Sequence, residues 1–238
     1  MKVIFLSKGE KRMKLLIDDA NIEAIKRLWD VMPIDGVTTN PTILSKYGDN
    51  PWDTLKAIRE VIGEDADLHV QAVPLDTEGM IEDAKKIVEV LGSKTIVKLP
   101  CVPAGFKAMK ACKKLGIRTT GTVVYTPLQA YLAAQAGAEF VAPYINRIDN
   151  MGYDGIRVCK EIQDILDCNN IETCGILAAS FKNSQQVLEL AKYGVEAATC
   201  APDVIDQFVA SPAIQAAADT FVKDFTKKFG KGSMKELI

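Results

Sequence analysis

The sequence alternates short β-like runs with amphipathic stretches, and this alternation occurs eight times along the chain. The strand candidates are LLID (15–18), GVTT (36–39), LHVQAV (68–73), TIVKLP (95–100), RTTGTVV (118–124), FVAPYI (140–145), ETCGILAAS (172–180) and EAATCAP (196–202). Helix-period segments lie between them, among others at 21–32, 77–92, 129–138 and 184–194. Strands that alternate with helices predict βαβ units and a parallel sheet. Eight such units predict a single (β/α)8 TIM barrel, of class α/β.

The main alternative to a barrel is an open, doubly wound parallel sheet. Such a sheet would be expected to carry a glycine-rich phosphate-binding fingerprint, and neither GxGxxG nor GxxxxGK[ST] occurs in the chain. No linker or low-complexity segment indicates a second domain. We therefore assign residues 1–12 to an N-terminal extension and 13–238 to one barrel, with Met13 as a natural start.

The C-terminal tail forms an additional predicted helix outside the eight units. It carries Phe221, Phe225 and Phe229 at a spacing of four residues, which places them on one helix face. Such an apolar stripe needs a surface to cover. We favour packing on the chain's own barrel, with docking on a neighbouring subunit as the alternative.

Composition excludes several classes of protein. The net charge is −2 and the chain has only two Trp, so neither a basic stripe nor aromatic stacking supports binding to nucleic acid. No apolar run is long enough to span a membrane, and the first residues are too short and too charged for a signal peptide. The six cysteines form no CxxC pair, and the single histidine excludes His-rich metal sites. We expect a cytoplasmic protein with reduced thiols, no metal and no cofactor.

Polar residues gather where the predicted strands end. TIM-barrel enzymes place their chemistry at this carboxyl-terminal face. The residues there are Asp18, Thr38, Thr39, Asn40, Gln71, Lys98, Thr122, Tyr144, Asn146, Arg147, Ser180, Lys182 and Asp203. Cys101 and His69 lie among them, and we interpret both as structural. The grouping predicts one active site at this mouth.

Lys98 is the most informative of these residues because apolar neighbours enclose it. Desolvation lowers the pKa of a buried lysine, and the resulting neutral amine can attack a carbonyl to form a Schiff base. A lysine that turns outward, or that pairs with an acid such as Asp18, is the alternative. Arg147, Ser180 and Lys182 together could bind an anion through a guanidinium, a hydroxyl and an ammonium.

Several stretches together resemble the transaldolase family in its short-chain branch. They are LLIDDANI (15–22), DGVTTNPTIL (35–44), TIVKLP (95–100), GTVVYTPLQAYLAAQAGAEFVAPYINRID (121–149) and ILAASFK (176–182). The resemblance implies a class I aldolase barrel in which Lys98 forms the Schiff base. It implies that Asp18 handles the substrate hydroxyl at the cleaved bond. Asn40 and Thr122 would hold donor hydroxyls and the catalytic water, beside Thr38, and Arg147 and Ser180 would clamp phosphate, with Lys182 as a further phosphate ligand.

Two positions resemble the fructose-6-phosphate aldolase subgroup in particular. Transaldolases proper have a glutamate in strand 3 and a phenylalanine before the strand 6 arginine, whereas this chain has Gln71 and Tyr144. In that subgroup the tyrosine hydroxyl acts together with the ordered water. The chain departs from the family pattern at Asp19, where Ser or Thr is usual.

The resemblance implies cleavage of fructose 6-phosphate to dihydroxyacetone and glyceraldehyde 3-phosphate, and the reverse addition. The alternatives are a transaldolase that moves a dihydroxyacetone unit from a ketose phosphate to an aldose phosphate, and a non-catalytic sugar-phosphate-binding barrel. The expected partners are phosphorylated ketoses and aldehydes. The family also implies a homo-oligomer, a pentamer or decamer with an exchanged C-terminal helix.

Overall fold

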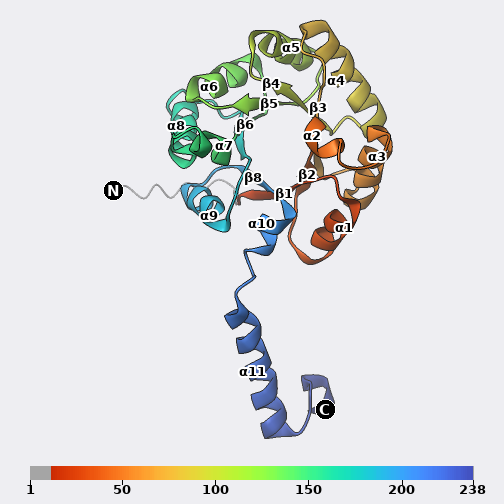
Figure 1. Ribbon diagram of the computed structural model, residues 1–238, viewed down its shortest axis with the longest axis vertical. Helices are drawn as coiled ribbons and strands as arrows, with labels where there is room; N and C mark the ends of the chain where they lie inside the picture. Colours follow the sequence, from red (N-terminus) through yellow and green to blue (C-terminus); the bar gives the residue numbers. More distant parts are fainter. Residues whose placement is uncertain (1–11, 238) are drawn as a thin grey trace.

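The computed structural model describes residues 12–237, in which eight parallel strands close into a barrel (Figure 1). The strands are β1 (Lys14–Asp18), β2 (Gly36–Thr38), β3 (Asp67–Gln71), β4 (Ile96–Pro100), β5 (Thr119–Val124), β6 (Phe140–Pro143), β7 (Gly175–Ala178) and β8 (Ala197–Cys200). Each strand pairs with its sequence neighbours, and β1 pairs with β8. The predicted (β/α)8 barrel is confirmed.

Helices surround the barrel and follow the strands in sequence. They are α1 (Ile22–Val31), α2 (Pro41–Leu44), α3 (Pro51–Ile62), α4 (Thr77–Leu91), α5 (Pro103–Lys114), α6 (Pro127–Ala136), α7 (Ile145–Asn150), α8 (Gly155–Cys168), α9 (Ser184–Tyr193) and α10 (Pro202–Asp206). Outside this ring follow α11 (Pro212–Phe229) and the 3-10 turn η1 (Met234–Leu237). The short helices α2, α7 and α10 follow β2, β6 and β8 directly. They therefore lie at the carboxyl-terminal end of the barrel.

Side-chain caps define where many of these helices begin. Residues Asn21, Asn40, Asn50, Asp76, Thr126, Asp154 and Asn183 each accept a hydrogen bond from a backbone N–H of the helix that follows. Such a cap satisfies one of the free N–H groups of the first helical turn. Asn21 and Asn40 also hold the loops after β1 and β2, which carry candidate site residues.

Apolar side chains form two layers of core. The larger one fills the space between the sheet and the helices, and a smaller cluster of Leu16, Ile96, Phe140, Leu177 and Ala197 fills the inside of the barrel. The amino-terminal end is closed by ion pairs, with Asp67 bound to Lys14 at 2.9 Å and to Arg118 at 3.3 Å. The barrel interior is therefore a packed core, and the charged groups at its amino-terminal end are paired with one another.

Some boundaries differ from the sequence-based expectation. Tyr144 is not the end of a strand but the residue before α7, and Arg147 lies within that helix. β3 and β7 end earlier than predicted, at Gln71 and Ala178, and the next residues keep only isolated contacts with the neighbouring strand. Residues 1–11 of the predicted extension lie outside the described residues.

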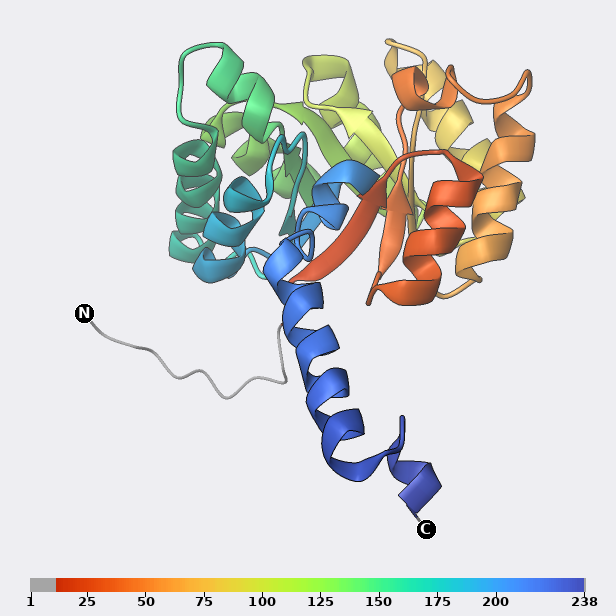
Figure 2. The ribbon, with the colours of Figure 1, turned by 60° about the horizontal axis from the view of Figure 1, so that its bottom comes forward.

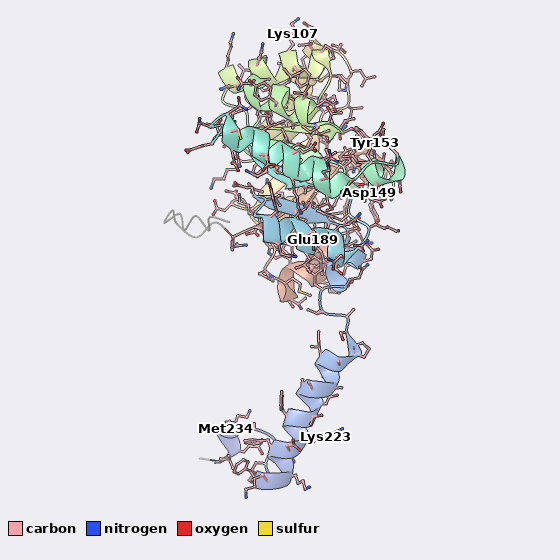
Figure 3. All side chains as sticks on the ribbon, turned by 90° about the vertical axis from the view of Figure 1, so that its left-hand side faces the viewer. Lys107, Asp149, Tyr153, Glu189, Lys223 and Met234 are labelled. Carbon is pink, nitrogen blue, oxygen red and sulfur yellow. The ribbon has the colours of Figure 1, made fainter. Side chains whose placement is uncertain are left out.

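The C-terminal helix α11 extends away from the barrel (Figures 1 and 2). None of its residues is buried, and Phe221 is 73% exposed. Figure 3 shows Lys223 on this helix and Met234 beyond it, both well separated from the body that carries Asp149 and Tyr153. The favoured expectation that the phenylalanine stripe packs on its own barrel is wrong. The spacing signalled an apolar face but contained no information about what covers it.

Within residues 12–237, no helix combines the length and the apolar character that crossing a membrane requires.

Candidate active site

Lys98 lies in the middle of β4 and is only 5% exposed. The strand pairs it with Gln71 of β3 on one side and Thr120 of β5 on the other. Its Nζ atom donates a hydrogen bond of 2.8 Å to the backbone carbonyl of Thr39. The lysine therefore turns neither outward nor into a hydrogen bond with Asp18.

Charge and burial act together on Lys98 and Asp18. Burial lowers the pKa of Lys98 from its ordinary value, the negative charge of Asp18 opposes this change, and Arg147 reinforces it. Burial raises the pKa of Asp18, while Lys98 and the hydrogen bond from Thr38 lower it. Desolvation disfavours the charged form of both groups. The site thus favours a neutral amine beside a carboxyl group that is more basic than usual.

The hydroxyl groups of Thr38 and Thr199 form a hydrogen-bonded chain that orients Asp18. Thr38 Oγ1 donates to Asp18 Oδ1 at 2.6 Å and lies 2.7 Å from Thr199 Oγ1 of β8. Since Thr38 has one hydroxyl proton and gives it to the carboxylate, Thr199 must donate to Thr38. Thr199 was missed by the sequence reasoning. Its only signal was a polar residue inside the apolar run EAATCAP.

Tyr144 and Thr122 form a second hydroxyl pair at the mouth of the barrel. Their hydroxyl oxygens lie 2.8 Å apart. The Tyr125 ring packs edge-on against the Tyr144 ring, with the ring centroids 5.7 Å apart. The Arg147 guanidinium lies over the face of the Tyr144 ring, 4.6 Å from its centroid. Burial raises the pKa of Tyr144, while Thr122 and Arg147 lower it. The phenol is held as a positioned proton donor.

Two residues at this mouth have a left-handed backbone although they are not glycine. Val123 has a φ of 60° and Ser180 a φ of 61°. A positive φ is uncommon for a β-branched residue and costs about 1–3 kcal/mol. The pairing of β5 with β6 shifts between Gly121 and Val124, so Val123 forms a bulge, and the adjacent Val124 carbonyl accepts from the Tyr144 N–H at 3.2 Å. This strain lies where side chains must be aimed, as is common beside active sites.

Gln71 lies beside the lysine on β3, and Asn40 lies in the loop between β2 and α2. Asn40 uses its Oδ1 atom to cap α2 at 2.9 Å, which leaves its NH2 group to donate to a ligand. Gln71 ends β3 directly beside Lys98 in the register of the sheet. Both side chains are partly exposed at the mouth.

The predicted anion-binding residues are only partly brought together. The backbone N–H of Asn146, next to Arg147, donates to the Ser180 carbonyl at 2.8 Å, which joins the ends of β6 and β7. Arg147 is exposed and Ser180 half-buried. Lys182 is exposed and bonds to Gln186 through its backbone, and Asp203 is exposed on α10. The backbone bond places α7, which carries Arg147, next to Ser180, and within residues 12–237 no side-chain hydrogen bond joins Arg147, Ser180 and Lys182.

Comparison with known proteins gives this site a family. The family model described as transaldolase/fructose-6-phosphate aldolase matches residues 15–236. The chain belongs to that family. The match covers nearly the whole chain, so the protein is an enzyme of transaldolase or aldolase type. It does not distinguish the subgroups within the family.

Solved structures share the barrel of this transaldolase/aldolase family member at low sequence identity. A structure described as native KDPGal has a TM-score of 0.57 at 13% identity, with 92% of this chain and 97% of that chain covered. A substituted flavocytochrome b2 has a TM-score of 0.59 at 12% identity, covering 95% of this chain and 67% of that one. Another flavocytochrome b2, with sulfite bound, has a TM-score of 0.56 at 12% identity, with 81% of this chain and 57% of that chain covered. These likenesses show the fold.

Other polar groups of this family member lie near the mouth or beneath it. Asp19 accepts hydrogen bonds from the backbone N–H groups of Ala20 and Asn21, and its charge helps to raise the pKa of Tyr47. His69 is buried below the lysine, bonds to Thr120 at 2.9 Å and has a pKa lowered to about 3 by burial. Cys101 is buried, with a pKa raised to about 12. Among residues 12–237, no three His, Cys, Asp or Glu side chains converge on a metal-sized site.

Proposed function

We propose that this protein is a Schiff-base aldolase that cleaves fructose 6-phosphate to dihydroxyacetone and glyceraldehyde 3-phosphate. The observation that carries the proposal is the environment of Lys98: its amine is buried and bonds to a neutral carbonyl, so it can lose its proton easily. The hydroxyl pair of Tyr144 and Thr122 at the same mouth adds an acid. Gln71 takes the place of a glutamate, so acid–base work falls on Tyr144.

The mechanism begins with addition of the Lys98 amine to C2 of the ketose. Loss of water gives an iminium ion, whose positive nitrogen can accept the electrons of the C3–C4 bond. Asp18 removes the proton of the C4 hydroxyl, and glyceraldehyde 3-phosphate leaves. The raised pKa of Asp18 suits it to this role as a base. Arg147 and Ser180 hold the phosphate during cleavage.

A three-carbon enamine then remains on Lys98. Protonation of its C3 by Tyr144 or by a water that Tyr144 and Gln71 hold gives a second iminium ion. Hydrolysis of that ion releases dihydroxyacetone and restores the amine. This series of reaction steps makes the enzyme a lyase.

Transaldolase activity is the second candidate, and one observation favours it. Burial raises the pKa of Tyr144, which makes its phenol a weaker acid. A slowly protonated enamine survives until an aldose phosphate arrives and adds to it. The two activities therefore differ in one proton transfer.

The test is release of glyceraldehyde 3-phosphate from fructose 6-phosphate, with and without erythrose 4-phosphate. We expect release without acceptor. Release only with acceptor would make the enzyme a transaldolase. No release in either case, together with no borohydride adduct at Lys98, would contradict the proposal. Lys98→Arg should abolish turnover because a guanidinium does not form the imine, and Lys94→Arg, on an exposed lysine paired with Asp65, is the matched control.

We also propose that the protein is a homo-oligomer in which α11 docks on a neighbouring subunit. Its exposed side chains include Ile214, Phe221, Val222 and Phe229, which would be costly to leave in water. Their burial against another copy would give the helix the partner that its own barrel does not supply.

A further inference from the structure

The carbonyl group of Thr39 is held rigidly between the second and third strands. The Thr39 backbone N–H donates to the His69 carbonyl at 2.9 Å, and the Thr39 hydroxyl donates to the same oxygen at 3.2 Å. Thr39 has no exposed surface, and His69 is itself fixed by Thr120 and by an edge-on contact with Phe140. The Thr39 carbonyl therefore has little freedom to move, and it accepts from Lys98 Nζ at 2.8 Å.

We propose that Thr39 is a positioning residue whose carbonyl holds the N–H of the covalent intermediates on Lys98 in one orientation. This inference rests on the proposed function, since it concerns the Schiff base. When the amine adds to a ketone and water leaves, the iminium nitrogen keeps one hydrogen. The enamine that follows keeps the same hydrogen. That N–H is buried and must have an acceptor, and the Thr39 oxygen is already in place.

The orientation of this N–H determines the plane of the intermediate. The nitrogen, its hydrogen and the substrate carbon C2 share the plane of the C=N bond, so a fixed N–H···O bond limits rotation about the lysine side chain. Cleavage requires the C3–C4 bond to stand across that plane, because only then do its electrons reach the iminium. In the reverse direction the same plane decides which face of the enamine meets the aldehyde. Thr39 therefore contributes to both rate and stereochemistry.

The Thr39 hydroxyl provides a way to test a backbone carbonyl. Thr39→Val keeps the shape of the side chain and the backbone N–H bond but removes the hydroxyl bond to His69, which loosens the carbonyl. Thr39→Ser keeps the hydroxyl. Thr119→Val is the matched control, because Thr119 is also a buried strand threonine and its hydroxyl has no partner within residues 12–237.

The experiment measures addition of dihydroxyacetone to glyceraldehyde 3-phosphate and the fraction of product that is a C3 or C4 epimer of fructose 6-phosphate. For Thr39→Val we expect kcat to fall about five- to tenfold, the size of one lost hydrogen bond, with KM for dihydroxyacetone little changed. The epimer fraction should rise by a similar factor. Thr39→Ser and Thr119→Val should match the wild type. General destabilisation would not change the ratio of epimers.

Borohydride trapping with dihydroxyacetone separates the two proposals. If the wild type forms the adduct and Thr39→Val keeps the wild-type kcat and epimer fraction, this inference is overturned while the proposed function stands. Equal losses in Thr39→Val and Thr39→Ser would also overturn it, since the hydroxyl would then be irrelevant. Absence of the adduct in the wild type would overturn both. If Thr39→Val does not fold, Thr39→Ala and Thr39→Ser give the same comparison, because they too differ in the hydroxyl.

Discussion

The Tyr144 hydroxyl lies 2.8 Å from the Thr122 hydroxyl, although Thr122 belongs to β5 and Tyr144 precedes α7. This contact anchors the phenol at the mouth of the barrel, where the Arg147 guanidinium covers one face of its ring. Next to the bulge at Val123, the Val124 carbonyl accepts from the Tyr144 backbone N–H and so fixes the residue to β5. Tyr144 is therefore a positioned phenol, and under the proposed function it is the group that protonates the enamine on Lys98.

Replacing Tyr144 should change the partition between cleavage and transfer. Tyr144→Phe removes the proton donor but keeps the ring beneath Arg147, so we expect acceptor-free cleavage to fall about 10²-fold and transfer to erythrose 4-phosphate to fall less. The ratio of the two rates is the measurement. Tyr125→Phe, which alters a ring in contact with Tyr144, is the control. An unchanged ratio in Tyr144→Phe would remove Tyr144 from this role.

The pH dependence of kcat/KM should report the state of Lys98. Only the neutral amine reacts, and burial lowers its pKa from 10.5, so activity should rise with pH and level off below 10.5. The charge of Asp18 raises the pKa of Lys98, so Asp18→Asn should move the rising limb to lower pH as well as slow turnover. A movement to higher pH would show that another group controls this limb.

Arg147 should discriminate between phosphorylated and unphosphorylated aldehydes. Arg147→Gln removes a charged hydrogen-bond donor, so we expect KM for glyceraldehyde 3-phosphate to rise about tenfold. KM for glyceraldehyde should remain nearly the same. Lys182→Gln should have a smaller effect, since that side chain is exposed and lies on the segment after β7 that bonds to Gln186. Equal effects on both aldehydes would contradict the phosphate clamp.

His69 should make the fold sensitive to acid. The pKa of His69 is about 3 in the folded chain, compared with an ordinary value of 6.5. Burial lowers this pKa, and the positive charges of Lys98, Arg118 and Lys14 lower it further, whereas the negative charge of Asp67 raises it. Between these values the unfolded chain binds more protons, so stability is fully present above pH 6.5 and falls towards pH 3. The loss is on the order of 5 kcal/mol.

Denaturant unfolding between pH 4 and 7.5 measures this dependence. His69→Phe should be less stable at pH 7 because the Thr120 hydroxyl loses its partner, yet its stability should fall less as the pH is lowered. The slope against pH is the quantity compared. An equal slope in the wild type and the variant would assign the acid sensitivity to other groups.

Removing the end of α11 should change the assembly and leave the barrel intact. Deletion of 221–238 removes the phenylalanine stripe, so sedimentation should show a smaller species, whereas thermal unfolding of the barrel should change little because no α11 residue is buried in its own chain. Lys223→Ala, a substitution off the stripe, should keep the wild-type assembly. An unchanged sedimentation coefficient after the deletion would refute docking through this helix.

Local patterns were enough to predict the barrel and the end of it at which the candidate site residues gather. The alternation of strand and helix periods is a property of neighbouring residues, and it is strong because each strand must bury both of its faces. Parallel strands all present their carboxyl ends at one mouth, so polar residues such as Asp18, Lys98 and Thr122 could be assigned to it from their positions alone.

The tertiary structure decided which of these groups meet. Lys98 donates to the Thr39 carbonyl and not to Asp18, and Thr199 of β8, which lies on the other side of β1 from β2, supports Thr38. Such partners depend on the tilt of the strands and the closure of the barrel, which bring together residues as distant in sequence as Thr38 and Thr199. The position of α11 was likewise decided by the tertiary structure, because the spacing of its phenylalanines indicates an apolar face but not which surface covers that face. Sequence periodicity indicates that a side chain must be buried or hydrogen-bonded. Which atom it contacts depends on the packing of the whole chain.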